Sequence, residues 1–165
     1  MGDSQKTNGA APSTARSGRL GRQSLWPILV LLAVCVAAFA WANRPVRSAV
    51  AWQHDFDAAK RQAAAEKRLL LVEFVSAGCG PCRAMDRDVF SKPEAADALD
   101  GFIPVRLDIN THRQLARDFG VNATPTLLVL SPDGKLVTAN VGAVPMRYFL
   151  LFLDQARAAA GRKQP

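Results

Sequence analysis

The sequence predicts an α/β fold in which a mixed central β-sheet carries helices on both faces, preceded by one N-terminal transmembrane helix. Three observations predict it. Short apolar runs alternate with helical segments from residue 55 onward. The turn signal Ser131-Pro132-Asp133-Gly134 separates two further strands, which predicts a hairpin. The third observation is an uncharged apolar run near the N-terminus, which predicts the transmembrane helix. Within the first half of the domain, the strand–helix–strand order favours parallel pairing of the strands.

The composition fits one domain with additional segments at its N-terminus. The chain has 165 residues, of which 49% are hydrophobic, and a formal net charge of +7. Acidic and basic residues are interspersed along the domain, and no basic stripe alternates with aromatic residues. We therefore expect no nucleic-acid partner. We find no flavin or nicotinamide motif and expect no bound cofactor.

Residues 1–24 are rich in small and polar residues with four basic residues against one acid, which predicts a disordered basic tail. Residues 25–42, LWPILVLLAVCVAAFAWA, carry no charge. As a helix, this run would span about 27 Å at ~1.5 Å per residue, close to the thickness of a bilayer core. Cys35 lies inside it and is expected to behave as a small apolar residue.

Two interpretations of residues 25–42 stay open at this point. The segment is either an uncleaved signal anchor, which we favour, or a signal peptide cut after Ala38-Phe39-Ala40. The basic tail favours a cytoplasmic N-terminus. The sequence therefore predicts a single-pass protein of the bacterial inner membrane, with residues 43–54 as a linker and residues 55–165 as a periplasmic domain.

The elements of the domain follow from its apolar pattern. Helices are expected where the pattern is helical or Ala-rich, and strands where a short apolar run is rich in β-forming residues. The expected helices are 55–67, opened by Asp55 or Asp57; 81–90; 93–99; 111–119, capped by Thr111 and ended by Gly120; and 145–160. The expected strands are 69–75, 102–109, 126–130 and 135–141.

The motif with the clearest chemistry is Cys79-Gly80-Pro81-Cys82, directly after the strand LLLVEFV. Cys79 would lie at a helix N-terminus, where unpaired N–H groups favour a thiolate. Cys82 would lie one turn later, within reach of a disulfide. Pro81 suits the first helical turn, and Gly80 lets a partner's backbone approach. We expect Cys79 to be the exposed attacking sulfur and Cys82 the shielded one in thiol–disulfide exchange.

Two other interpretations of the cysteine pair carry less weight. A structural metal site needs further ligands, and the chain offers no second cysteine pair and no histidines at a suitable spacing. A structural disulfide is possible in an exported protein, but closing so small a loop constrains the unfolded chain little.

From Asp55 to Gln155 the chain resembles the thioredoxin superfamily. The resemblance rests on LLVEFVSAGCGPC, on Ala123-Thr124-Pro125-Thr126 and on Val141-Gly142-Ala143. The stretch CRAMDRDVFSKPEAADAL is more similar to the C-terminal periplasmic domain of DsbD-type thiol:disulfide interchange proteins. The resemblance implies a thioredoxin fold. One departure is Gly78, because these families usually place Trp directly before the first cysteine.

The resemblance also implies roles for individual residues. Cys79 is the nucleophile, Cys82 the resolving thiol, and Pro125 a cis-proline that leaves the backbone of Thr124 free to pair with an extended substrate. Glu73 is the buried proton acceptor for Cys82, with a carboxylate turned to solvent as the alternative. Asp86 tunes the thiols, or else lies on a solvated helix face.

These expectations combine into a membrane-tethered thiol:disulfide oxidoreductase, most simply a reductase of protein disulfides outside the cytoplasm. Gly-Pro between the cysteines is typical of reducing members of the family. Electrons would come from a membrane or periplasmic dithiol donor. The alternative is a binding module without turnover, or a metallochaperone, that uses the dithiol to hold partner proteins or Cu(I).

Overall fold

The computed structural model describes residues 25–42 and 47–161, and these two ranges belong to two separate units. The described part of the first unit is helix α1, Trp26–Ala42, 17 residues long. Within the two described ranges, no helix combines the length and apolar character needed to cross a membrane. The transmembrane helix expected over residues 25–42 is therefore not confirmed. The expected tail, 1–24, lies outside the described residues.

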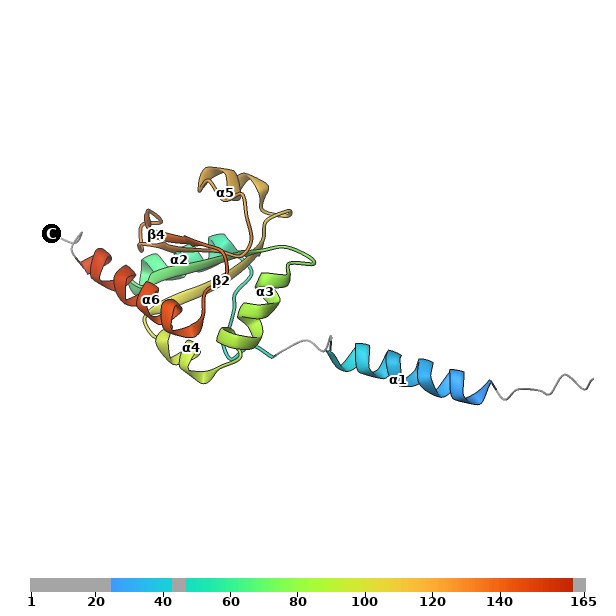
Figure 1. The fold of residues 1–165 in the computed structure, drawn as a ribbon. Coiled ribbons are helices and arrows are strands. Elements are labelled where there is room, and N and C mark those ends of the chain that lie inside the picture. Colours follow the sequence, from blue (N-terminus) through green and yellow to red (C-terminus); the bar gives the residue numbers. More distant parts are fainter. Residues whose placement is uncertain (1–24, 43–46, 162–165) are drawn as a thin grey trace, which may run out of the picture. The chain divides into compact units, whose positions relative to one another are not determined.

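The second unit is built on one four-stranded mixed sheet (Figure 1). Its strands are β1 Leu69–Val75, β2 Phe102–Asp108, β3 Thr126–Leu130 and β4 Leu136–Val141. They lie in the order β2-β1-β3-β4; β1 and β2 are parallel, and β3 is antiparallel to both β1 and β4. The predicted parallel pair and the predicted hairpin are both confirmed. In the expected linker, Gln53 forms a parallel bridge to Val105 in β2.

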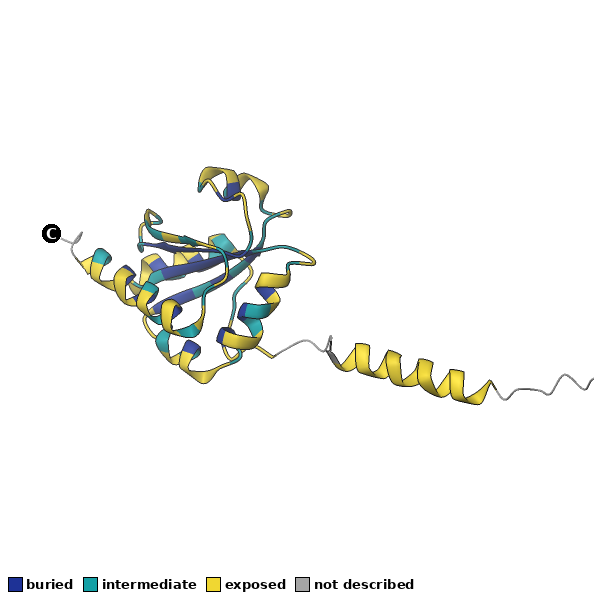
Figure 2. Ribbon diagram, in the orientation of Figure 1, coloured by how far each residue is buried: buried dark blue, intermediate teal, exposed yellow. Residues whose placement is uncertain are grey.

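Helices cover both faces of this sheet, as the sequence predicts. They are α2 Phe56–Glu66, α3 Gly80–Met85, the π-helical turn η1 Asp86–Phe90, α4 Pro93–Ala98, α5 Arg113–Asp118 and α6 Met146–Gly161. Side chains of α3, η1, α4 and α6 form one core cluster, and side chains of α2 and α5 form the other. Figure 2 shows strands β1, β2 and β3 largely buried and the helices exposed on their outer surfaces, whereas the edge strand β4 has no buried residue.

Of three residues predicted to begin or end a helix, the structure confirms two. Asp55 caps α2, and its carboxylate accepts a hydrogen bond from Ala58 N–H at 2.9 Å. Gly120, with φ +68°, follows α5 as predicted. The predicted cap at Thr111 is wrong. Its hydroxyl donates to the carbonyl of Asp108 instead, and α5 starts two residues later without a capping side chain.

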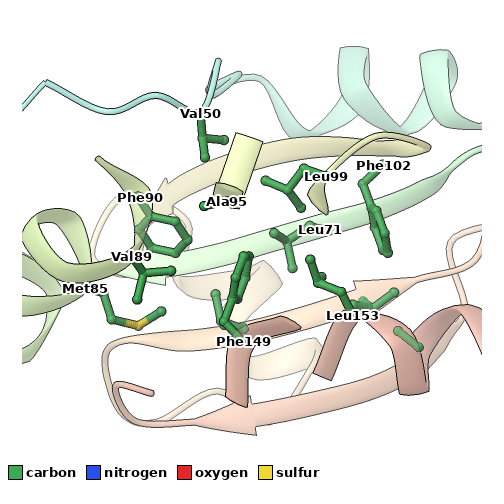
Figure 3. Close-up of a cluster of buried hydrophobic side chains, with 13 residues drawn as sticks. Val50, Leu71, Met85, Val89, Phe90, Ala95, Leu99, Phe102, Phe149 and Leu153 are labelled. Carbon is green, nitrogen blue, oxygen red and sulfur yellow. The ribbon is translucent and has the colours of Figure 1, made fainter. Parts of the chain in front are cut away.

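The core cluster beneath α3 and η1 fixes the helix that carries the cysteine motif (Figure 3). Met85 and Val89 are buried, and the ring of Phe90 meets that of Phe149 in α6 edge-on, with centroids 5.5 Å apart. Because the far end of this helical segment is embedded, its N-terminal turn is held at the carboxyl end of β1. The cysteine motif begins there.

Candidate redox site

The two cysteines of the motif form a disulfide at the start of α3. Cys79 is the residue that precedes the helix, and its sulfur accepts a hydrogen bond from Cys82 N–H at 3.1 Å. Cys79 is half-buried, whereas Cys82 is only 5% exposed. The helix N-terminus favours negative charge on the outer sulfur. An incoming sulfur therefore has access to Cys79, and Gly80 and Pro81 beside it are exposed.

Gly78, which stands where related families usually carry Trp, adopts a left-handed backbone conformation. Its φ is +76°, and a Cβ placed on it would have no heavy atom within 4 Å. The position is open, but any L-residue other than glycine is strained there. Glycine rather than an aromatic residue at this position therefore suits the backbone turn that directs the chain from β1 into the cysteine motif.

We expect Gly78→Ala to destabilise the oxidised protein by about 1 kcal/mol, because only the backbone conformation opposes the new methyl group. Urea unfolding measures this change. Gly80→Ala is the matched control. Gly80 opens α3 with no positive φ and equally open space, so its replacement is expected to leave stability unchanged or raise it slightly. Equal destabilisation by both variants would contradict the argument.

The loop before β3 lies beside the cysteine motif. The Thr124–Pro125 peptide bond is cis, as the resemblance implies. The hydroxyls of Thr124 and Ser76 are hydrogen-bonded at 2.8 Å, and Ser76 also accepts the N–H of Cys79 on its carbonyl at 3.2 Å. On the other side, Gly142 N–H donates to the carbonyl of Pro125 at 2.8 Å. The proline loop is therefore tied both to the cysteine motif and to the end of β4.

Glu73 is fully buried in the middle of β1, which excludes the alternative of a carboxylate turned to solvent. One oxygen, Oε2, accepts a hydrogen bond from Arg106 Nε at 2.6 Å, while Oε1 is buried with no hydrogen-bond partner. Burial raises the pKa of Glu73 from its ordinary 4.5 to about 7, against the lowering effect of Arg106. Glu73 can therefore take up or release a proton near neutral pH.

Asp86 is joined to the same cluster and does not lie on a plain solvated face. Its Oδ1 accepts a hydrogen bond from Arg106 Nη2 at 2.6 Å, so one guanidinium binds two carboxylates. Asp86 is four residues beyond Cys82 and opens η1. The ion pairs therefore connect β1, β2 and the helical segment that carries the cysteines.

Arg106 and Trp52 are members of this cluster that the sequence analysis missed. Arg106 lies directly opposite Glu73 in the parallel register of β1 and β2, and Trp52 covers its guanidinium at 4.6 Å. A buried carboxylate needs a partner, and a lone basic residue in an apolar strand was a signal for one. Nothing in the sequence indicated Trp52, because its contact depends on the path of the segment before α2.

The described residues contain no group of three or more His, Cys, Asp or Glu side chains placed to hold a metal ion. What they do assemble is an accessible sulfur in a disulfide, a shielded second sulfur, a buried acid with one free oxygen, and a proline loop. This set of groups is suited to thiol–disulfide exchange, with a proton acceptor in the strand that precedes the cysteines.

Comparison with known proteins points the same way. Residues 51–132 match a family model described as thioredoxin-like. The chain is 29% identical to the thiol:disulfide interchange protein DsbD 2 of Pseudomonas aeruginosa. The match covers 67% of this chain but only 23% of that relative. It is 30% identical to thioredoxin 2 of Chlorobaculum tepidum, over 53% of this chain and 78% of the relative. A solved thioredoxin from Thermus thermophilus superposes with a TM-score of 0.61 at 28% identity, over 68% of this chain and 90% of that one.

Proposed function

The chain belongs to the thioredoxin-like family, and on that premise we propose that it is a thiol:disulfide oxidoreductase acting on protein disulfides through Cys79 and Cys82. The observation that carries the proposal is the disulfide at the start of α3, with Cys79 accessible and Cys82 buried beneath it. A structural staple would have no need of one accessible sulfur, a neighbouring proline loop and a buried acid.

In the reductive direction, the thiolate of Cys79 attacks one sulfur of a substrate disulfide. That bond breaks, one substrate thiolate leaves, and a mixed disulfide with Cys79 forms. Cys82 then gives up its proton, and its thiolate attacks the sulfur of Cys79. The second substrate thiolate leaves and takes up a proton, and the Cys79–Cys82 disulfide forms. Two electrons have passed to the substrate, and a membrane or periplasmic dithiol donor must return them.

Glu73 is the proposed acceptor of the Cys82 proton. Its free oxygen and its pKa of about 7 suit proton transfer at neutral pH, because a general base works best when its pKa lies near the operating pH. On the substrate side, we propose that Gly80, Pro81, Thr124 and Pro125 form the surface against which an extended substrate segment lies.

Reduction of an insulin disulfide by the full chain with dithiothreitol tests the activity. We expect the rate to exceed that of dithiothreitol alone and to fall to it in Cys79→Ser. A wild-type chain with no activity above background would contradict the proposal. It would favour the alternative of a dithiol that holds partner proteins or Cu(I) without turnover.

We propose reduction as the physiological direction, on the basis of Gly80-Pro81 between the cysteines. Equilibration of the pair with glutathione measures its potential. A value near the ~−270 mV of thioredoxin supports a reductase, whereas a value near the ~−120 mV of DsbA would reverse the assigned direction.

For location, we propose that residues 25–42 direct the domain across the bacterial inner membrane to the periplasm. The support is the sequence alone: a basic tail followed by an uncharged apolar run. Cell fractionation with N-terminal sequencing tests this. A membrane-bound chain that retains its N-terminus indicates an anchor, and a soluble periplasmic chain that begins at Trp41 indicates a cleaved signal peptide. A full-length chain in the cytoplasm would contradict export.

A further inference from the structure

The guanidinium of Arg106 bridges two carboxylates that lie on different elements. It donates from Nε to Glu73 and from Nη2 to Asp86, each at 2.6 Å. The side chain of Arg106 is only 18% exposed. A flexible arginine loses rotamer freedom when it bridges two acids on different elements. Further contacts are therefore needed to keep the guanidinium bound to both carboxylates at once.

Two aromatic rings hold it. The centre of the guanidinium lies 4.6 Å from the ring of Trp52 and 5.4 Å from the ring of Phe90. These two rings meet edge-on with centroids 5.0 Å apart. A cation over an aromatic face is attracted to it, most strongly over tryptophan. Phe90 lies in η1 and is buried in the core. Of the two rings, Trp52 is therefore the one that comes from outside the sheet and its helices.

Trp52 is itself fixed at both ends. Its indole N–H donates to the hydroxyl of Ser48 at 3.2 Å, and that hydroxyl also donates to the carbonyl of Phe90 at 3.3 Å. The next residue, Gln53, accepts the backbone N–H of Arg106 at 2.9 Å. The segment from residue 48 to 53 thus contacts both the backbone and the side chain of Arg106.

We propose that Trp52 is a positioning residue of the redox site, which holds the Arg106 guanidinium where it binds Glu73 and Asp86 together and leaves Glu73 Oε1 free. Trp52 acts through Arg106 on the acid that receives the Cys82 proton, and in that step the inference rests on the function proposed above. The segment before α2 thereby becomes part of the acid–base apparatus of the site.

The charges that act on Glu73 come from two elements. Arg106 in β2 lowers the pKa of Glu73 through its charge and its hydrogen bond, and Asp86 at the start of η1 raises it. From β3, the register partner of Glu73 is Leu127, which carries no charge. Weakening the hold on Arg106 therefore reduces the lowering effect, and the pH at which Glu73 titrates should rise.

The test is a carboxyl ¹³C NMR titration of the full chain in its oxidised form, with the Glu73 signal assigned by its loss in Glu73→Gln. Trp52→Leu keeps an apolar cover over the site but removes the aromatic face. We expect it to raise the midpoint of Glu73 by about 0.5 to 1 pH unit. Arg106→Met should raise it further, and Trp52→Phe less.

Phe56→Leu is the matched control. Phe56 is a partly buried aromatic that packs against Phe119 in the other core cluster, so its loss should leave the midpoint of Glu73 unchanged. An unchanged or lowered midpoint in Trp52→Leu would overturn the inference. If that variant does not fold, the order of Trp52→Phe between wild type and Arg106→Met decides. The titration needs no substrate, so a chain without insulin reductase activity would contradict the proposed function and still leave this result readable.

Discussion

A Cys82→Ser variant is expected to accumulate mixed disulfides with its substrates through Cys79, and its turnover with insulin should fall to the rate of dithiothreitol alone. The reason lies in the difference between the two sulfurs. Cys79 is accessible and can still attack the substrate disulfide. The substitution removes the buried sulfur of Cys82, which would make the second, resolving attack. Non-reducing gels of cells that express the variant, followed by mass spectrometry of the trapped species, measure the effect.

Cys79→Ser is the matched control, since it keeps one thiol in the same turn of α3. It should trap nothing, because Cys82 is 5% exposed and lies beneath the first turn. Trapping by both variants to the same extent would mean that either sulfur can attack, and the assignment of nucleophile and resolving thiol would be wrong. A lack of trapping in Cys82→Ser would count against exchange with protein disulfides altogether.

The fold was predictable because its signals are local. Each apolar run of the domain became a strand within one residue of its expected bounds, as LLLVEFV and TLLVL show. Errors arose where a local signal competes with another local partner. Thr111 has the right chemistry for a helix cap, yet its hydroxyl bonds the carbonyl of Asp108. The expected helix 81–90 also changes to a π-helical turn at Asp86, and hydrophobic spacing alone does not reveal such a change.

The site was predictable only in part, for the same reason. Cys79 and Cys82 are neighbours in sequence, and Glu73 is marked by its place in an apolar strand. Arg106 and Trp52 reach the site through pairings between distant segments: the parallel register of β1 with β2, and the bridge of Gln53 to β2. Register follows from which faces are buried across the whole sheet, so no single stretch of the sequence contains it.

Glu73 should make the oxidised protein less stable as the pH rises from about 5 to 8. In the unfolded chain its pKa is near 4.5, and in the folded chain it is about 7. Below pH 4.5 the carboxyl is protonated in both states, and its contribution to stability is fully present. Between the two pKa values the unfolded chain releases the proton while the folded chain keeps it, so folding loses free energy until the pH passes 7. The difference corresponds to about 3 kcal/mol.

Glu73→Gln removes this titration, because an amide stays neutral and can still accept from Arg106 on its oxygen. We expect the variant to exceed the stability of the wild type by about 1 kcal/mol at pH 5 and by about 3 kcal/mol at pH 8, and to show little pH dependence of its own between these values. Urea unfolding at both pH values measures this. Glu66→Gln is the control: Glu66 is exposed, its pKa is lowered by Arg68, and its own titration lies below this pH window. A wild-type stability that is flat from pH 5 to 8 would mean that Glu73 is charged throughout that range, and it could not then take the proton of Cys82.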